Sequence, residues 1–284
     1  MKKLGDLLEH GCNLSQELTQ QEYEQKKADY YNKQEGNLND SDGYNCDICK
    51  NKGFIAFVQD CGMYHSETLK PCKCMKVRAA INRLKRSGLK NIVKDYTLKK
   101  YEVREPWQAT LKEAAQRFIS EDADKHWFFM GGQSGAGKTH LCTAIAVHYI
   151  KAGYDMKYML WLDEITRIKA VANDDEEHNA LMTELKTAKV LYIDDLFKNG
   201  KDDFGNVKNP TASDVKHAFE ILNYRYNNPD LITIISSERT ISELCQIDEA
   251  IAGRISERTK AQGYCLNIKR DPERNWRLKD LQEI

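Results

Sequence analysis

The chain has 284 residues, of which 41% are hydrophobic, so it has room for about two domains and can bury at least one substantial core. Its 43 basic and 43 acidic residues give a formal net charge of zero, which excludes a global field that would draw it to nucleic acid or an anionic membrane. No apolar run approaches the ~20 residues that cross a bilayer, and charges interrupt the first segment where a signal peptide would be apolar. We therefore expect a cytoplasmic protein with no membrane partner.

Residues 1–45 are the first of four segments that differ in composition. This segment is polar, with leucines spaced along its first half. The spacing predicts a helical segment. Its five basic and nine acidic residues favour a solvated helical face over a docking surface.

Residues 46–75 hold five of the nine cysteines, and without an export signal such a cluster indicates metal more often than disulfide. The cysteines that form two close pairs are Cys46, Cys49, Cys72 and Cys74. Four thiolates in two pairs suit tetrahedral Zn²⁺, so we predict a zinc-binding module. Cys61 and His65, which lie between the pairs, are alternatives for one of the four ligands.

Residues 76–100 carry nine basic residues against one acidic residue, an asymmetry that the neutral total conceals. A basic stretch beside a small metal module is suited to phosphate contact, with an affinity that falls steeply with salt. An exposed linker helix explains the same composition. We predict a basic linker and leave these two interpretations equal.

Residues 101–284 alternate between helix-period segments and short apolar segments. This alternation is typical of an α/β domain with a parallel sheet flanked by helices. The predicted strands are 126–130, 156–161, 189–193, 231–236 and 264–268. Two helices are expected between the second and third strands, over 162–170 and 176–186.

Gly132–Thr139 fits the phosphate-loop pattern G-x-x-x-x-G-K-[ST], with an apolar strand before it and a helical stretch after it. The glycines let backbone N–H groups turn toward phosphate oxygens, where a Cβ would obstruct them. Lys138 is predicted to reach the β- and γ-phosphates, and the Thr139 hydroxyl to bind Mg²⁺. The residues expected to contact the nucleotide here are Gly132, Gln133, Ser134, Gly135, Ala136, Gly137, Lys138, Thr139 and His140.

The strand at 189–193 runs into Asp194 and Asp195, at the edge where ligands bind in parallel sheets. Asp194 is predicted to hold Mg²⁺, and Asp195 is the candidate to orient or activate the attacking water. The two motifs together predict a protein that binds a nucleoside triphosphate and hydrolyses it.

The order and spacing of four motifs resemble those of AAA+ ATPases. The motifs are Gly132–Thr139, Tyr192-Ile-Asp-Asp-Leu, Thr233-Ile-Ile-Ser-Ser-Glu and Ala252-Gly-Arg-Ile-Ser-Glu-Arg. More narrowly, residues 101–284 resemble replicative-helicase loaders of the DnaC/DnaI type and the IstB transposition ATPase, and the cysteine module resembles the zinc-binding part of the DnaI branch. This resemblance implies a P-loop AAA+ fold with a five-stranded parallel sheet, preceded by a small helical and zinc-binding region.

The resemblance also implies roles for residues on the later strands. On the fourth strand, Ser237 is expected to sense the γ-phosphate, with Ser236 and Glu238 as alternatives. Asp195 stands where relatives often carry the longer Glu, so slow hydrolysis is expected, which would suit a switch.

Three arginines near the end of the chain resemble known positions of the family. Arg258, and secondarily Arg254, resembles the arginine finger that reaches the nucleotide of a neighbouring subunit, where a guanidinium suits the charge on the transferred phosphoryl group. Arg277 is the expected sensor-2 residue.

The helical element between the second and third strands is expected to contact single-stranded DNA through Arg167 and Lys169, although the acidic run at 174–177 opposes this.

The leading hypothesis is an ATP-dependent loader of a replicative DNA helicase onto single-stranded DNA, with ATP, Mg²⁺ and Zn²⁺ as cofactors. Residues 1–100 are expected to recognise the helicase, and the ATPase domain to associate with further copies of itself. The alternatives are a transposition helper ATPase that binds duplex DNA, a nucleotide kinase, and a non-catalytic zinc protein that binds nucleic acid.

Overall fold

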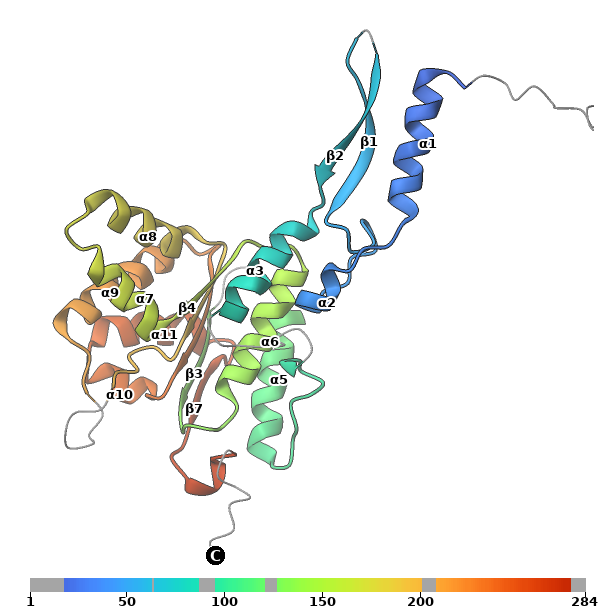
Figure 1. The fold of residues 1–284 in the computed structure, drawn as a ribbon. Helices are drawn as coiled ribbons and strands as arrows, with labels where there is room; N and C mark the ends of the chain where they lie inside the picture. Colours follow the sequence, from blue (N-terminus) through green and yellow to red (C-terminus); the bar gives the residue numbers. More distant parts are fainter. Residues whose placement is uncertain (1–17, 63, 87–94, 121–126, 201–207, 277–284) are drawn as a thin grey trace, which may run out of the picture. The chain divides into compact units, whose positions relative to one another are not determined.

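A computed structural model of the chain describes most of its length (Figure 1). The described residues are 18–62, 64–86, 95–120, 127–200 and 208–276. The chain divides into two compact units, residues 1–75 and residues 76–284. No helix among the described residues is long and apolar enough to cross a membrane.

The first unit contains two helices and a β-hairpin. Helix α1 spans Gln20–Lys33 and begins at a capping box, in which Thr19 and Glu22 satisfy each other's backbone N–H groups. Helix α2 spans Leu38–Asp42. The antiparallel strands β1 (Phe54–Asp60) and β2 (His65–Pro71) follow.

Helix α1 packs against the hairpin and pairs with one of its edges. Ala28 on this helix is fully buried. The Asn32 side chain accepts from the Ala56 N–H at 3.0 Å and donates to the Ala56 carbonyl at 2.8 Å. An exposed strand edge presents unpaired backbone groups, so this amide replaces a neighbouring strand at one position.

Helix α3 (Cys74–Arg86) occupies the first half of the stretch predicted as a basic linker. Val77, Ala80 and Ile81 are buried, and their i, i+3, i+4 spacing forms one apolar face. Arg78 is buried as well. This first half of the stretch is therefore a helix with one packed face, and neither interpretation of its charge included such packing.

The second unit is built on a parallel sheet with the strand order β4-β5-β6-β3-β7. The strands are β3 (Trp127–Gly132), β4 (Met156–Leu160), β5 (Val190–Asp194), β6 (Ile232–Ser237) and β7 (Cys265–Ile268). All five predicted strands are confirmed, each within two residues at either end. Strands β3, β5 and β6 are buried along their whole length, as expected for a sheet covered on both faces.

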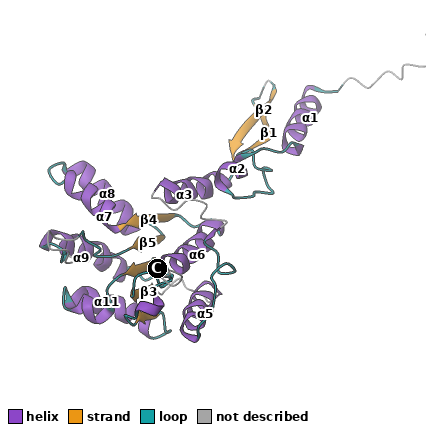
Figure 2. Ribbon diagram, turned by 60° about the horizontal axis from the view of Figure 1, so that its bottom comes forward, coloured by secondary structure: helices purple, strands orange, loops and turns teal. Residues whose placement is uncertain are grey.

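Helices cover both faces of this sheet (Figures 1 and 2). Helices α5 (Pro106–Ser120) and α6 (Lys138–Lys151) lie on one side. The opposite side carries α7 (Trp161–Ala170), α8 (Asp175–Thr187), α9 (Ala212–Tyr226), α10 (Ile241–Cys245) and α11 (Glu249–Lys260). A short 3-10 helix, Pro272–Arg274, follows β7. The layers bury a core that includes Trp127, Phe129, Trp161 and Ile193.

The side chain of Arg225 connects α9, α8 and β6. Its side chain is fully buried, and this burial lowers its pKa to about 9, so the guanidinium stays charged at neutral pH. Its five hydrogen bonds, at 2.6–3.3 Å, go to the Thr233 hydroxyl and to the carbonyls of Leu185, Lys186, Ala188 and Ile232. The guanidinium thus fastens the end of α8 and the start of β6 to α9.

We expect Arg225→Lys to lower the free energy of unfolding by about 2 kcal/mol, because a lysine ammonium has three donors and leaves buried carbonyls unpaired. Urea unfolding followed by circular dichroism measures this change. The control is Arg117→Lys on the exposed surface of α5, which should stay within about 0.5 kcal/mol. Equal stability of the two variants would contradict the role assigned to Arg225.

Candidate functional site

The turn between β3 and α6 needs its glycines. Gly132, Gly135 and Gly137 have positive φ angles of 106°, 74° and 84°. A Cβ on Gly132 would lie 2.0 Å from the Ile268 carbonyl oxygen, and one on Gly135 would lie 2.0 Å from Oδ1 of Asn275. The loop therefore keeps its shape only with glycine at these positions.

Lys138 begins α6 with its ammonium group folded back onto this loop. Its side chain is 5% exposed, and Nζ donates to the carbonyls of Gly132 at 2.9 Å and Gln133 at 2.7 Å. Burial lowers the pKa of Lys138, and the negative charges of Asp195 and Glu238 partly oppose this. The positive group thus lies at the N-terminus of α6, where backbone N–H groups favour an anion.

Asp194, at the end of β5, is surrounded by hydroxyl groups. Thr139 donates to Oδ1 at 3.3 Å, which brings together the two residues predicted to bind Mg²⁺. The other donors are Tyr192 at 2.8 Å and Ser236 at 2.5 Å to Oδ1, and Tyr158 at 2.9 Å to Oδ2. Both carboxylate oxygens are thereby fixed in direction.

Sequence reasoning missed the two tyrosines. Tyr192 lies two residues before Asp194 and therefore faces the same side of the strand. This spacing in the sequence could have predicted their proximity. Tyr158 faces Tyr192 across the β4–β5 register, with ring centroids 5.2 Å apart, and this depends on tertiary pairing. Burial first, and then the Asp194 charge, raise the pKa of Tyr192 well above its ordinary value, so its hydroxyl remains a donor.

Asp195 is held by a cation that the sequence did not predict as functional. Lys198 Nζ lies 2.8 Å from Oδ2 of Asp195 and 3.1 Å from Oε1 of Glu238. Burial, followed by the Asp194 charge, raises the pKa of Asp195, while Lys198 opposes the rise. The candidate catalytic acid is therefore part of an ion-paired network with Glu238, at the end of the neighbouring strand β6.

A cavity of about 470 Å³, a size typical of small-molecule sites, lies at the phosphate loop, and Asp194 is not among the described residues that line it. The residues 134–140 line it, together with Asp195, Lys198 and Glu238. The aromatic residues Tyr96, Tyr101, Trp107 and Trp276 also line it, as do the polar residues Lys100, Glu102 and Gln108. The His140 ring packs against Tyr96 and Tyr101 at centroid distances of 5.3 and 5.4 Å. A cavity lined by both a phosphate-loop motif and aromatic rings suits a nucleotide.

Several predicted residues are not among those that line this cavity. The fully buried Ser237 donates its hydroxyl to the Leu196 carbonyl at 2.8 Å, and of the three γ-phosphate sensor candidates only Glu238 lines the cavity among the described residues. Arg254 and Arg258 both lie over the Tyr226 ring, at 5.5 and 5.3 Å from its centroid. Arg277 lies outside the described residues.

The two residues expected to contact DNA are paired with acids. Lys169 lies 2.5 Å from Asp214, and Arg167 lies 3.6 Å from Glu164. Phosphate contact by either side chain has to compete with these carboxylates.

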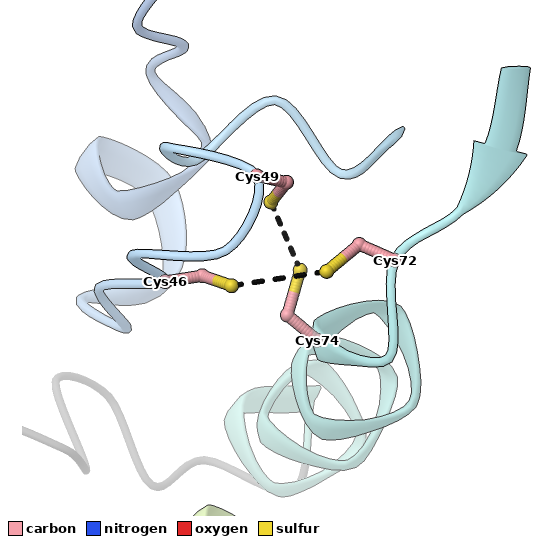
Figure 3. A group of neighbouring side chains, drawn as sticks. All are labelled: Cys46, Cys49, Cys72 and Cys74. Atoms are coloured by element: carbon pink, nitrogen blue, oxygen red, sulfur yellow. Dashed lines mark hydrogen bonds between the residues drawn. The ribbon is translucent and has the colours of Figure 1, made fainter. Parts of the chain in front are cut away.

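The four paired cysteines of the first unit converge on one point (Figure 3). Their sulfur atoms all lie within 4.8 Å of one another, and all four residues are buried. Burial raises the pKa of the Cys49 thiol, but hydrogen bonds from the Gly53 N–H and the neighbouring thiols outweigh it and lower the pKa to about 7. Tetrahedral sulfur ligation is the arrangement that structural zinc prefers, so the donor set fits this ion.

The alternative ligands lie elsewhere on the hairpin. Asp60 pairs with His65 near the turn, whereas Phe54 pairs with Pro71 next to the cysteine cluster. With about 3.4 Å per residue, this places the turn roughly 20 Å from the cluster. Cys61 is exposed there, and His65 lies 3.8 Å from an Asp60 oxygen. Neither belongs to the sulfur cluster.

The fold and the cavity together define a P-loop protein of the AAA+ class, in which β6 separates the phosphate-loop strand β3 from the acidic strand β5. Residues 75–281 match the family of IstB-like ATP binding proteins, and the chain belongs to this family.

The chain is similar to two curated relatives and to one solved structure. It is 32% identical to the phage-like element PBSX protein XkdC of Bacillus subtilis, over 77% of this chain and 80% of that protein. It is 26% identical to the replicative helicase loader DnaC of Buchnera aphidicola, over 50% of this chain and 58% of that protein. The structure of AMPPCP-bound DnaA from Aquifex aeolicus is 20% identical, with a TM-score of 0.49 over 65% of this chain and 53% of that chain.

Proposed function

We propose that the protein is an ATP-dependent loader of a replicative DNA helicase onto single-stranded DNA. The observation that supports the ATPase part is the contact between Thr139 at the phosphate loop and Asp194 on β5, the two residues proposed to bind Mg²⁺. The loader part rests on the likeness to DnaC of Buchnera aphidicola, which is named a replicative helicase loader.

Residues at the cavity and beside it have the following roles in this proposal. Lys138 binds the β- and γ-phosphates, and Thr139 and Asp194 hold Mg²⁺, which neutralises charge on the phosphates when bound. Asp195 orients the water that attacks the γ-phosphorus, so that ADP and phosphate form. The aromatic residues Tyr96, Tyr101, Trp107 and Trp276 receive the base.

Arg258 is proposed to complete the site of a neighbouring copy of the chain. Its position over Tyr226 places it outside the residues that line the cavity of its own subunit. We therefore expect Asp195→Asn and Arg258→Ala each to retain ATP binding and to lose most hydrolysis, measured as phosphate release.

Mixing the two variants tests both roles at once. A mixed assembly contains interfaces with an intact Asp195 on one side and an intact Arg258 on the other, so activity should partly recover. An Asp195→Asn protein mixed with Lys138→Ala protein is the matched control, because neither variant supplies an intact nucleotide site, and activity should not recover. If the first mixture stays inactive at concentrations where the chains associate, the proposed role of Arg258 in trans is wrong.

The cysteine cluster is proposed to hold Zn²⁺ and thereby to order the first unit as the helicase-recognition module.

Full-length protein with ATP should retain the purified replicative helicase of its host on an affinity column. The Lys138→Ala variant should retain less, whereas Lys151→Ala, at the exposed end of the same helix, should match the unmodified protein. Absence of helicase with all three proteins would overturn the loader proposal.

A transposition helper ATPase is the second candidate, and the match of residues 75–281 to IstB-like proteins favours it. Binding to fluorescent oligonucleotides in the presence of ATP separates the two. A loader should prefer single strands, whereas tighter binding to duplex DNA of the same sequence would favour the transposition role.

A further inference from the structure

Lys198 is a charged group at the nucleotide cavity to which the proposed function gives no role. It lines the cavity together with the phosphate loop, and 42% of its side chain is exposed. Its ammonium bridges the carboxylates of Asp195 and Glu238, at 2.8 and 3.1 Å. Two acids from the ends of adjacent strands thus share one cation.

The backbone that carries Lys198 is firmly placed. Asp195 and Phe197 both have φ of 59°, a conformation that non-glycine residues rarely adopt. The Asp195 N–H donates to the Ser236 hydroxyl at 2.9 Å, the Leu196 N–H donates to the Ser236 carbonyl at 2.8 Å, and the buried Phe197 ring packs on Trp161. Backbone strain of this kind persists only where the surroundings impose it, and it collects at functional sites. A fixed backbone therefore aims a long, half-exposed side chain into the cavity.

The bridge also lies beside the phosphate loop. Burial raises the pKa of Glu238, but Lys198 and, to a smaller extent, Ser134 of the phosphate loop lower it. Ser134 and Glu238 line the same cavity, so the Asp195–Lys198–Glu238 bridge adjoins the phosphate loop. The charges of Lys198, Asp195 and Glu238 all act on Lys138, the phosphate-binding lysine. The group that holds the candidate catalytic acid is thus electrostatically coupled to the place where phosphates bind.

We propose that Lys198 distinguishes ATP from ADP: it rests on Asp195 and Glu238, and a bound γ-phosphate draws its ammonium away and frees Asp195 to orient water. This inference rests on the proposed ATPase function. ATP adds a γ-phosphate beyond the terminal phosphate of ADP, and this group, with about two negative charges against one on each carboxylate, is the one proposed to reach Lys198. Coulomb attraction therefore favours the exchange only with the triphosphate.

Titration calorimetry with MgATP and MgADP tests the proposal on full-length protein. Lys198→Met should weaken ATP binding about tenfold and change ADP binding less than about twofold, because part of the Coulomb attraction is lost to solvent screening. Lys198→Arg keeps the charge and should largely preserve the ratio of the two affinities. Lys186→Met is the matched control, since it removes a Lys–Glu ion pair that lies outside the nucleotide cavity and should leave the ratio unchanged.

Glu238→Gln supplies a result of opposite sign. It removes one of the carboxylates that compete for Lys198, so the preference for ATP over ADP should rise. A purely structural ion pair would instead make both variants lose ATP and ADP affinity together, and that result overturns the proposal. An unchanged ratio in Lys198→Met with normal binding in the unmodified protein also overturns it while leaving the ATPase function intact. Failure of the unmodified protein to bind either nucleotide would reject both.

Discussion

Lys138→Ala is expected to lower the affinity for ATP by at least about 100-fold, which corresponds to roughly 2.7 kcal/mol. In the proposed role, this buried lysine donates charge-assisted hydrogen bonds to phosphate, and such bonds are about twice as strong as neutral ones. Calorimetry with MgATP measures the change directly.

The same substitution removes the two hydrogen bonds that Lys138 makes to the phosphate-loop carbonyls, so the thermal stability must be measured alongside. Lys151→Ala on the exposed end of α6 is the matched control, because it deletes an equal charge from the same helix. Retention of near-normal ATP affinity by a folded Lys138→Ala protein would reject the assignment of the phosphate site.

Cys49→Ser is expected to abolish zinc binding and to unfold the cysteine module. Structural zinc contributes on the order of 10 kcal/mol in small modules, more than the limited core of this unit can replace. Zinc content by atomic absorption should fall from one ion per chain to none, and protease should then cut within residues 46–75. ATP affinity should remain, because the nucleotide cavity lies in the second unit.

Cys61→Ser provides the matched control within the same module. This cysteine is exposed near the hairpin turn and does not belong to the sulfur cluster. It should keep both the zinc and the protease resistance. Loss of zinc in Cys61→Ser, or a Cys49→Ser module that stays folded after chelation, would contradict the ligand set.

The features that could be predicted from the sequence are those set by local patterns. The five strands are short apolar runs, and the phosphate loop is a contiguous motif whose glycines are required by backbone angles. The four clustered cysteines were also recognisable by spacing alone. The hairpin between the cysteine pairs was not predicted, because β2 is largely polar and its pairing with β1 is not visible in its composition.

The parts of the site that escaped prediction depend on which strands become neighbours. Lys198 and Glu238 meet because β5 and β6 are adjacent, although the residues lie 40 positions apart in the sequence. Tyr158 reaches Asp194 for the same reason, across the β4–β5 pair. Strand order also decides which of three consecutive side chains lines the nucleotide cavity. Ser236 hydrogen-bonds to Asp194 and Ser237 to the Leu196 carbonyl, whereas Glu238 lines the cavity.

The segment after β7 forms direct hydrogen bonds with the phosphate loop. The Asp271 N–H donates to the Gln133 side chain at 3.1 Å, and the Trp276 N–H donates to the Gly135 carbonyl at 3.1 Å. A backbone adjustment that accompanies nucleotide entry therefore has a short route to residues 271–276, without passing through the hydrophobic interior. A macromolecule bound to residues 271–276 would therefore bind or dissociate in response to the nucleotide state of the phosphate loop.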